Sequence, residues 1–285
     1  MNNTQNIQWF PGHMAKTKRL IAEQLKLIDA VVEIVDARIP VSSRNPDLTG
    51  IIQNKPHLIL LNKCDMADIG ATNDWITYYK SKNITAIAVD CKSGKGLNTF
   101  KDTVKTVLSD KLKSYKEKGM VGKPLRVMAV GIPNVGKSSF INRIAGNNRA
   151  KVENRPGVTK GNQWFSVDKE LELLDTPGVL WPKFDDDTVG EHLAFTGAVS
   201  DRIIDTELLA MRLLEILVAD YKQLLLDRYG NFEIHEDAYE TLCEIGKKRG
   251  MMIKGGEVDT ERAANMLLEE FRNCKLGKIT LERIK

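Results

Sequence analysis

The sequence predicts an α/β fold, with a mostly parallel sheet and helices between its strands, followed by a small all-α domain. Three short apolar runs, at 30–35, 58–61 and 84–89, have strand length and are each followed by polar or turn residues. Near-continuous apolar runs are typical of strands that a parallel sheet buries on both faces. From about residue 183 the pattern changes to long helical periodicity. We therefore expect an extension over 1–17, an α/β domain over 18–182 and a helical domain over 183–285.

Further elements complete the α/β domain. Helices are predicted over 15–28 and 97–112 from their apolar faces, and a third begins at Ser138. Additional strands are predicted over 126–130, 163–167 and 170–174. The segment 111–126 is rich in lysine and contains Gly119, Gly122 and Pro124, so we expect a flexible or partly ordered connector there.

Three amphipathic segments make up the predicted helical domain. They cover 206–229, 237–249 and 260–274, and the first has Asp205 in the position of an N-cap. Only Lys247, Lys248, Arg249 and Lys254 form a local basic patch, for which a solvated helix end and an RNA contact are both open interpretations.

A phosphate-binding loop follows the strand predicted over 126–130. The segment Gly131-Ile-Pro-Asn-Val-Gly-Lys-Ser138 matches G-x-x-x-x-G-K-S between a strand and a helix, although a chance glycine-rich turn is the alternative. Backbone amides of such a loop surround phosphates, Lys137 would bind the β- and γ-phosphates, and Ser138 would bind Mg2+. The predicted nucleotide contacts of this loop are Asn134, Val135, Gly136, Lys137, Ser138 and Ser139.

Two further segments are candidates for sensing the γ-phosphate. Asp175-Thr-Pro-Gly178 follows a predicted strand, so Asp175 would support Mg2+ and the Gly178 amide would reach the γ-phosphate. Thr159 lies in the loop after the phosphate-loop helix and is the candidate switch threonine that reaches Mg2+, with an ordinary loop hydroxyl as the alternative.

A guanine-binding tetrapeptide is predicted at the end of the strand over 58–61. In Asn62-Lys-Cys-Asp65, the Asp65 carboxylate can accept hydrogen bonds from N1 and N2 of guanine, which adenine cannot supply. Lys63 can lie along the base plane. After the next strand, Asp90-Cys91-Lys92 stands where GTPases usually have Ser-Ala-Lys, and the Cys91 amide is expected to reach the guanine O6.

The order of these motifs is reversed relative to an ordinary GTPase chain, because the guanine tetrapeptide precedes the phosphate loop. All the motifs follow strands, and the carboxyl ends of parallel strands meet at one edge of a sheet. The sequence therefore predicts a circularly permuted P-loop GTPase fold with an intact site for GTP or GDP and Mg2+.

With Trp9-Phe-Pro-Gly-His-Met14 near the start, the motifs together resemble the circularly permuted GTPases that assemble ribosomes, and among them the bacterial ribosome biogenesis GTPase A family. The resemblance covers nearly the whole chain. It implies GTP hydrolysis coupled to a late step of large ribosomal subunit assembly in the cytoplasm, with contact to ribosomal RNA. We expect a monomer when the protein is free, with neither membrane nor DNA among its partners.

Two residue roles also come from the resemblance. Val179 stands where many small GTPases place a water-orienting Gln, and the resemblance implies that His13 takes that task. A packed or surface histidine is the alternative. Asn134 resembles the Asn of potassium-activated GTPases, which implies a K+ site, whereas a turn-forming Asn is equally compatible with the residue.

Composition narrows the partners and leaves two other functions open. Residues 200–285 have 14 Lys and Arg against 17 Asp and Glu, so the basic surplus lies in the preceding part of the chain, where a polyanion would bind. No pair of the four cysteines has C-x-x-C spacing, so neither a zinc site nor a disulfide framework is indicated. Scattered thiols are compatible with a reducing cytosol.

Two other functions stay open. A small-molecule phosphotransferase on a P-loop fold is one, although such an enzyme would not need the guanine tetrapeptide N-K-x-D. A GTP-dependent binding switch or RNA chaperone with little turnover is the other, and the absence of a water-orienting Gln at position 179 favours it.

Overall fold

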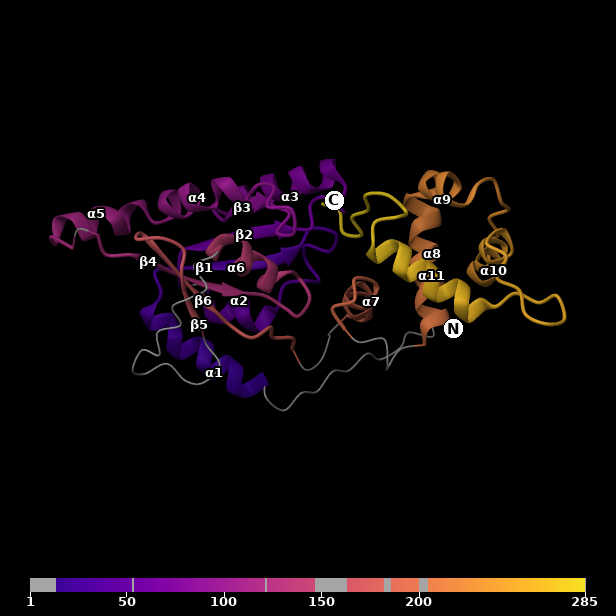
Figure 1. Ribbon diagram of the computed structural model, residues 1–285, viewed down its shortest axis with the longest axis horizontal. Helices are drawn as coiled ribbons and strands as arrows, with labels where there is room; N and C mark the ends of the chain where they lie inside the picture. The colour runs from indigo at the N-terminus through magenta and orange to yellow at the C-terminus, as the bar shows by residue number, and fades with distance from the viewer. Residues whose placement is uncertain are drawn as a thin grey trace. The chain divides into compact units, whose positions relative to one another are not determined.

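The computed structural model describes residues 14–52, 54–120, 122–146, 163–181, 186–199 and 205–284, and side chains from Arg19 onward (Figure 1). These residues form two compact units. The first contains the described residues up to 181 together with 282–284, and the second contains those between 186 and 281.

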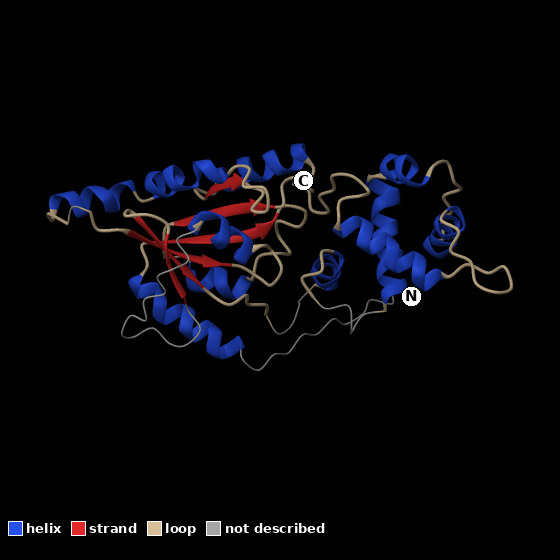
Figure 2. Ribbon diagram, in the orientation of Figure 1, coloured by secondary structure: helices blue, strands red, loops and turns tan. Residues whose placement is uncertain are grey.

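The first unit is built on one six-stranded sheet, drawn in red in Figure 2. Its strand order is β3-β2-β1-β4-β6-β5. All neighbours are parallel except β5 and β6, which are antiparallel. The strands are β1 (Ala30–Asp36), β2 (His57–Asn62), β3 (Thr85–Ala88), β4 (Leu125–Val130), β5 (Gln163–Ser166) and β6 (Leu171–Asp175). The predicted mostly parallel sheet is confirmed.

The apolar runs form central strands because helices cover both faces of the sheet. Every residue of β1 is buried. On one face, Ile21 of α1 (Met14–Gln24) and Leu48 of α2 (Pro46–Ile52) pack with Val31, and α3 (Ile69–Ser81) covers the neighbouring strands. Also covering the sheet are α4 (Phe100–Val107) and α6 (Lys137–Ala145), whose aromatic rings Phe100 and Phe140 meet edge to face with centroids 5.0 Å apart.

The lysine-rich connector is more ordered than predicted. Short 3-10 turns at Leu25–Leu27 and Leu97–Thr99 precede β1 and α4, and α5 (Ser109–Glu117) continues the helical path well past residue 111. Leu112 and Tyr115, three residues apart, lie on one face of α5, and the buried Tyr115 hydroxyl donates a 2.9 Å hydrogen bond to Asp29. The helix itself contains neither glycine nor proline, and lysine is a good helix former, so local propensity and this tertiary contact both favour the helix.

The second unit is all helical, as predicted. It contains α7 (Asp187–Phe195), α8 (Thr206–Asp220), α9 (Lys222–Tyr229), α10 (Ala238–Lys248) and α11 (Thr260–Arg272). Asp205 caps α8 through the amide of Leu208. The predicted helix over 206–229 breaks at Tyr221, whose hydroxyl donates a 2.6 Å hydrogen bond to the Thr280 carbonyl. Among the residues that the structure describes, no helix has both the length and the apolar content that a membrane span needs.

The end of the described chain belongs to the first unit. The Glu282 carboxylate accepts hydrogen bonds from the amides of Val41 and Ser42, at 2.5 and 3.0 Å, and from the Ser42 hydroxyl. The Trp75 indole donates a 2.8 Å hydrogen bond to the Glu282 carbonyl. The second unit is therefore connected by the chain to the first unit at both of its ends.

Candidate nucleotide site

The phosphate loop joins β4 to α6 at the carboxyl end of β4. A Cβ atom at Gly131 would lie 2.7 Å from the Ile34 carbonyl oxygen, and one at Gly136 would lie 2.2 Å from Asn62 Nδ2. Gly136 also has a φ of 96°, a conformation that side-chain-bearing residues rarely adopt. The glycine spacing of the motif therefore follows from close packing against two neighbouring strand ends.

The phosphate loop and the D-T-P-G segment border one cavity of about 440 Å³. Asn134, Gly136, Lys137, Ser138, Ser139 and Gly178 are among the residues that line it. A Cβ at Gly178 would lie 3.0 Å from the Pro133 amide nitrogen, so a larger residue would crowd the phosphate loop here. Two predicted motifs separated by about 40 positions are thus placed around a common space that can accept phosphates.

Lys137 and Asp175 meet at this cavity. The Lys137 ammonium lies 3.1 Å from an Asp175 carboxylate oxygen, and the lysine side chain is only 10% exposed. An ammonium, a hydroxyl at Ser138 and a carboxylate at Asp175 are the groups that a Mg2+-phosphate needs. In the described part of the chain, no group of three or more His, Cys, Asp or Glu side chains is arranged so that it could hold a metal ion. Mg2+ would therefore take most of its ligands from phosphates and water, as it does in other nucleotide sites.

Asn62 connects the predicted guanine end of the site to the phosphate loop. Its Nδ2 donates to the Val135 carbonyl at 2.6 Å, and its Oδ1 accepts from the Cys91 amide at 2.9 Å. Because Asn62 is buried, both hydrogen bonds are shielded from water. One side chain therefore holds the phosphate loop against the two segments that are predicted to bind guanine.

The loop after β3 is held by its own first residue. The Asp90 carboxylate accepts from the amides of Lys92 and Ser93, at 2.8 and 3.2 Å. Burial opposes its charge, yet the hydrogen bonds with Ser93 and Lys92 lower the pKa of Asp90. This carboxylate is engaged in shaping the loop, and the Cys91 amide is engaged with Asn62. Direct contacts of Asp90 and Cys91 with guanine stay predictions.

The Asp65 carboxylate lies on the exposed side of the tetrapeptide, whereas Cys64 is partly buried beside it. The Cys64 amide donates to the Val89 carbonyl at 3.2 Å, which aligns this segment with the end of β3. Burial, together with the neighbouring Asp65 charge, raises the pKa of the Cys64 thiol. Asp65 is therefore carried on a backbone fixed at two neighbouring strand ends.

An ion-pair cluster beneath Lys63 was missed by the sequence analysis. The Lys63 ammonium lies 2.9 Å from Asp36, which also forms a two-point contact with Arg38, at 3.0 and 2.8 Å. Asp36 and Arg38 are each only 2% exposed. Burial alone would raise the pKa of Asp36, but the positive charges of Arg38 and Lys63 lower it well below its usual range. The one available signal was the pair of opposite charges in Asp36-Ala-Arg38 directly after a buried strand.

Val179 is buried in the core of the first unit, at 1% exposure. Its amide donates to the Gly131 carbonyl at 3.3 Å, and its carbonyl accepts from Asn45 Nδ2 at 2.9 Å. Its side chain is thus directed into the core and cannot orient a water molecule at the phosphates. His13, predicted to orient the water, and Thr159, predicted to reach Mg2+, lie outside the described residues.

Asn134 has a positive φ of 61°, which Asn tolerates better than most residues. This conformation supports the turn-forming role, and the K+ role stays a prediction.

In the second unit, Arg249 stacks over the Tyr229 ring at 5.1 Å, and Lys247 pairs with Glu244 at 2.7 Å. Half of the basic patch at 247–254 is therefore engaged within its own unit.

Comparisons with known proteins agree with this geometry. A family model described as 50S ribosome-binding GTPase matches residues 126–251, beginning inside β4 and leaving out the guanine tetrapeptide, as expected for a permuted chain. Ribosome biogenesis GTPase A of Priestia megaterium is 50% identical over 278 residues, which cover 97% of this chain and 96% of the relative. The corresponding Bacillus cereus protein is 48% identical, covering 97% and 93%.

A solved structure supports the same relationship. GNP-bound YlqF from T. maritima is 28% identical and superposes with a TM-score of 0.63, covering 94% of this chain and 98% of the YlqF chain. Near full-length coverage in sequence and structure includes both the permuted domain and the helical domain. The chain therefore belongs to the ribosome biogenesis GTPase A family, a family of GTP hydrolases.

Proposed function

We propose that this protein hydrolyses GTP to GDP and phosphate during a late step of large ribosomal subunit assembly, in the cytoplasm and in contact with ribosomal RNA. The observation that carries the guanine-nucleotide part is the Asn62 bridge between Val135 and Cys91. The names of its relatives support the ribosomal part. We also propose the domain limits 1–17, 18–182 and 183–285.

In this proposal the nucleotide lies between Asp65 and the phosphate loop. The Asp65 carboxylate selects guanine, and Lys63, held by Asp36, lies along the base. Lys137 exchanges its contact with Asp175 for the β- and γ-phosphates and neutralises their charge. Ser138, Thr159 and Asp175 would hold Mg2+, which would stabilise charge on the phosphate oxygens.

The water-orienting group must come from another residue than Val179, because that side chain is buried in the core. We assign the role to His13. The Gly178 amide senses the γ-phosphate, and the chain continues from there through Val179 towards α7. Loss of the γ-phosphate would thus act on the segment that leads directly into the helical unit.

A binding switch or RNA chaperone with little turnover is the second candidate, and the burial of Val179 is the observation that favours it. Co-sedimentation with purified large ribosomal subunits tests the ribosomal proposal in the GTP, GDP and nucleotide-free states. We expect binding in the GTP state and release in the GDP state. Equal and negligible binding in all three states would refute the proposal.

A further inference from the structure

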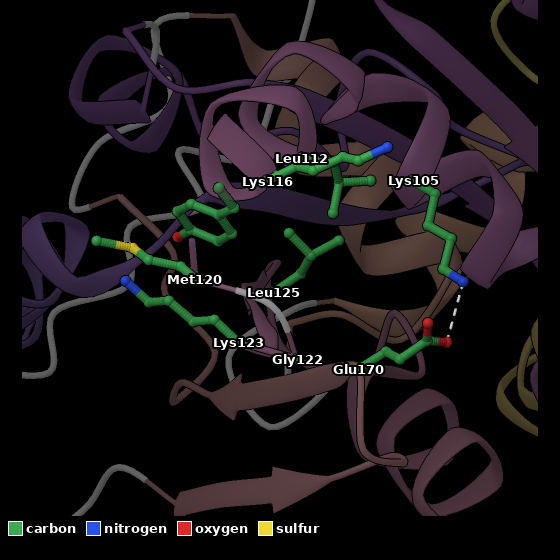
Figure 3. Close-up of a pocket in the computed structure, with 9 residues that line it drawn as sticks. Lys105, Leu112, Lys116, Met120, Gly122, Lys123, Leu125 and Glu170 are labelled. Carbon is green, nitrogen blue, oxygen red and sulfur yellow. Dashed lines mark hydrogen bonds and ion pairs between the residues drawn. The ribbon is translucent and has the colours of Figure 1, made fainter. Parts of the chain in front are cut away.

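A pocket of about 280 Å³ is lined by residues of α5, of the segment that follows it and of β4 (Figure 3). Figure 3 shows Leu112 and Leu125 in its middle, Met120 and Lys123 at one end, and the Lys105–Glu170 pair at the other. Leu125 begins β4, and the phosphate loop follows the far end of the same strand. At about 3.3 Å per residue, this six-residue strand separates the pocket from the phosphates by roughly 20 Å. The pocket is therefore distinct from the site described above.

The floor of the pocket is apolar and contains an aromatic ring. Leu112, Tyr115, Met120 and Leu125 are four of the nine residues that line it. Met120 is 43% exposed, which is high for a large apolar side chain. The volume lies just below the range of about 300–1,000 Å³ that is usual for drug-sized ligands, so a single flat group such as one nucleobase fits better than a larger molecule.

The rim of the pocket has more positive charge than its own carboxylates can balance. Between Lys105 and Arg126 the sequence has seven basic residues and two acidic ones. Glu170 is paired with Lys105 at 3.0 Å and Lys101 at 2.6 Å, and Asp29 accepts from Tyr115. In contrast, the ammonium groups of Lys116, Lys118 and Lys123 are exposed, and no carboxylate within the described residues forms an ion pair with them.

Lys123 is also placed against the aromatic ring. Its ammonium lies 4.7 Å from the centroid of Tyr115, and that of Lys111 lies 5.4 Å away. Cations and an aromatic ring around an apolar pocket match the two parts of a nucleotide, its phosphate and its base. An acidic peptide would satisfy the lysines but would leave the apolar floor unfilled. A double helix would not present an unstacked base to the pocket.

We propose that this surface binds single-stranded RNA, with one base in the pocket and the neighbouring phosphates on Lys116, Lys118 and Lys123. The inference rests on the proposed function, since it names a place where that function's RNA partner binds. It adds a binding site on the first unit whose residues take no part in nucleotide binding.

The phosphate contacts are tested with a fluorescent 12-nucleotide oligouridine RNA and the full chain loaded with GDP. The variant Lys116→Gln/Lys118→Gln/Lys123→Gln removes three charges without adding repulsion. Single-stranded nucleic acids lose about 0.7 in salt slope for each phosphate contact, so we expect the slope to become shallower by about 2. If the three lysine–phosphate contacts contribute nothing to RNA affinity near 1 M salt, the RNA affinity of the variant at 0.15 M salt should be about 40-fold below that of wild type.

The matched control is Lys26→Gln/Lys80→Gln/Lys82→Gln, which removes three exposed lysines from other elements of the same unit. It should keep the wild-type slope, and both triple variants should keep wild-type GDP affinity. A slope that is equal in the two variants would overturn the proposal. So would direct binding of a poly-glutamate peptide without any binding of RNA, which would make the surface a protein-binding site.

The base pocket is tested by comparing the same RNA with an abasic strand of equal length. A stacked base contributes about 5- to 150-fold in affinity, so wild type should prefer oligouridine by at least that lower factor. In Met120→Glu, at an exposed position, the preference should fall towards 1. An unchanged preference would exclude the pocket.

Failure of this inference and failure of the proposed function have different signatures. If wild type binds large subunits in the GTP state and the Lys116/Lys118/Lys123 variant binds them equally well, only the RNA site is wrong. If wild type itself binds no subunits, the proposed function is wrong.

Discussion

The Asn62 side chain donates a 2.6 Å hydrogen bond to the backbone carbonyl of Val135, 73 positions later in the chain. In the permuted order, the guanine segment is made before the phosphate loop, yet this hydrogen bond fixes one against the other. The parallel neighbours β1–β2 and β1–β4 bring both loops to the same edge of the sheet.

Replacing Asn62 by Ala should therefore weaken the binding of both GTP and GDP. The change leaves the Val135 carbonyl and the Cys91 amide without their buried partner, at a cost of about 2 kcal/mol, which corresponds to about 30-fold in affinity. Fluorescent-nucleotide titration measures it. Asn73→Ala, at an exposed position on α3, is the control. Wild-type affinity in Asn62→Ala would contradict the bridge.

Asp65→Asn should change nucleotide choice more than fold stability. An amide has one acceptor oxygen in place of the two of a carboxylate, so it cannot give guanine N1 and N2 an oxygen each, whereas its NH2 group can donate to the C2 carbonyl of xanthine. We expect GTP affinity to fall at least 100-fold and the XTP-to-GTP affinity ratio to rise. Competition titrations with GTP, XTP and ATP give this ratio. Retained guanine preference would remove Asp65 from the site.

Much of this arrangement could be predicted from the sequence, because motif residues occupy strand ends and the strands themselves are apolar runs. The phosphate loop, the D-T-P-G segment and the guanine tetrapeptide all follow predicted strands. Asp205 was also predicted as a cap, since its position before an apolar periodic segment is a local feature.

The remaining features depend on tertiary contacts that the sequence order conceals. Asp36 meets Lys63 only because β1 and β2 are neighbours, with Asp36 opposite Asn62. α5 extends into the predicted connector, where the Tyr115 hydroxyl donates a hydrogen bond to Asp29, 86 positions away. The break at Tyr221 likewise depends on Thr280. In each case the contact partner is distant in the sequence.

The Asp36 cluster should make stability fall in acid. The folded pKa of Asp36 is lowered, so its contribution is complete above the pKa of an unfolded aspartate, about 3.9, and is lost as pH falls below it. Asp36→Asn should lose about 3–5 kcal/mol at pH 7, because Arg38 stays buried without its anion. Its unfolding free energy should also depend less on pH below 4.

Urea unfolding at pH 7, 4 and 3 measures both effects. Asp74→Asn, at an exposed position on α3, serves as the control and should follow wild type at every pH. If Asp36→Asn and wild type lost stability in parallel below pH 4, the ion-pair cluster would not be the source of the acid sensitivity.

Glu282→Ala should destabilise the first unit by about 1–2 kcal/mol, because Val41 and Ser42 lose their shared acceptor. Thermal unfolding, monitored by tryptophan fluorescence, measures this loss of stability, since the Trp75 indole donates a hydrogen bond to the Glu282 carbonyl. Arg283→Ala is the neighbouring control: its ion pair with Asp68 is exposed at 3.4 Å, so we expect a change below about 0.5 kcal/mol. Equal effects of the two changes would refute a special role for Glu282.

In the proposed function, a permuted guanine-nucleotide site drives GTP hydrolysis on the ribosome. The most direct measurement is multiple-turnover GTP hydrolysis with and without purified large ribosomal subunits, for wild type and for His13→Ala. We predict slow hydrolysis by wild type alone, a rise of at least tenfold with subunits, and no such rise in His13→Ala, whose GTP affinity stays near wild type. Wild-type turnover that subunits leave unchanged would contradict the account.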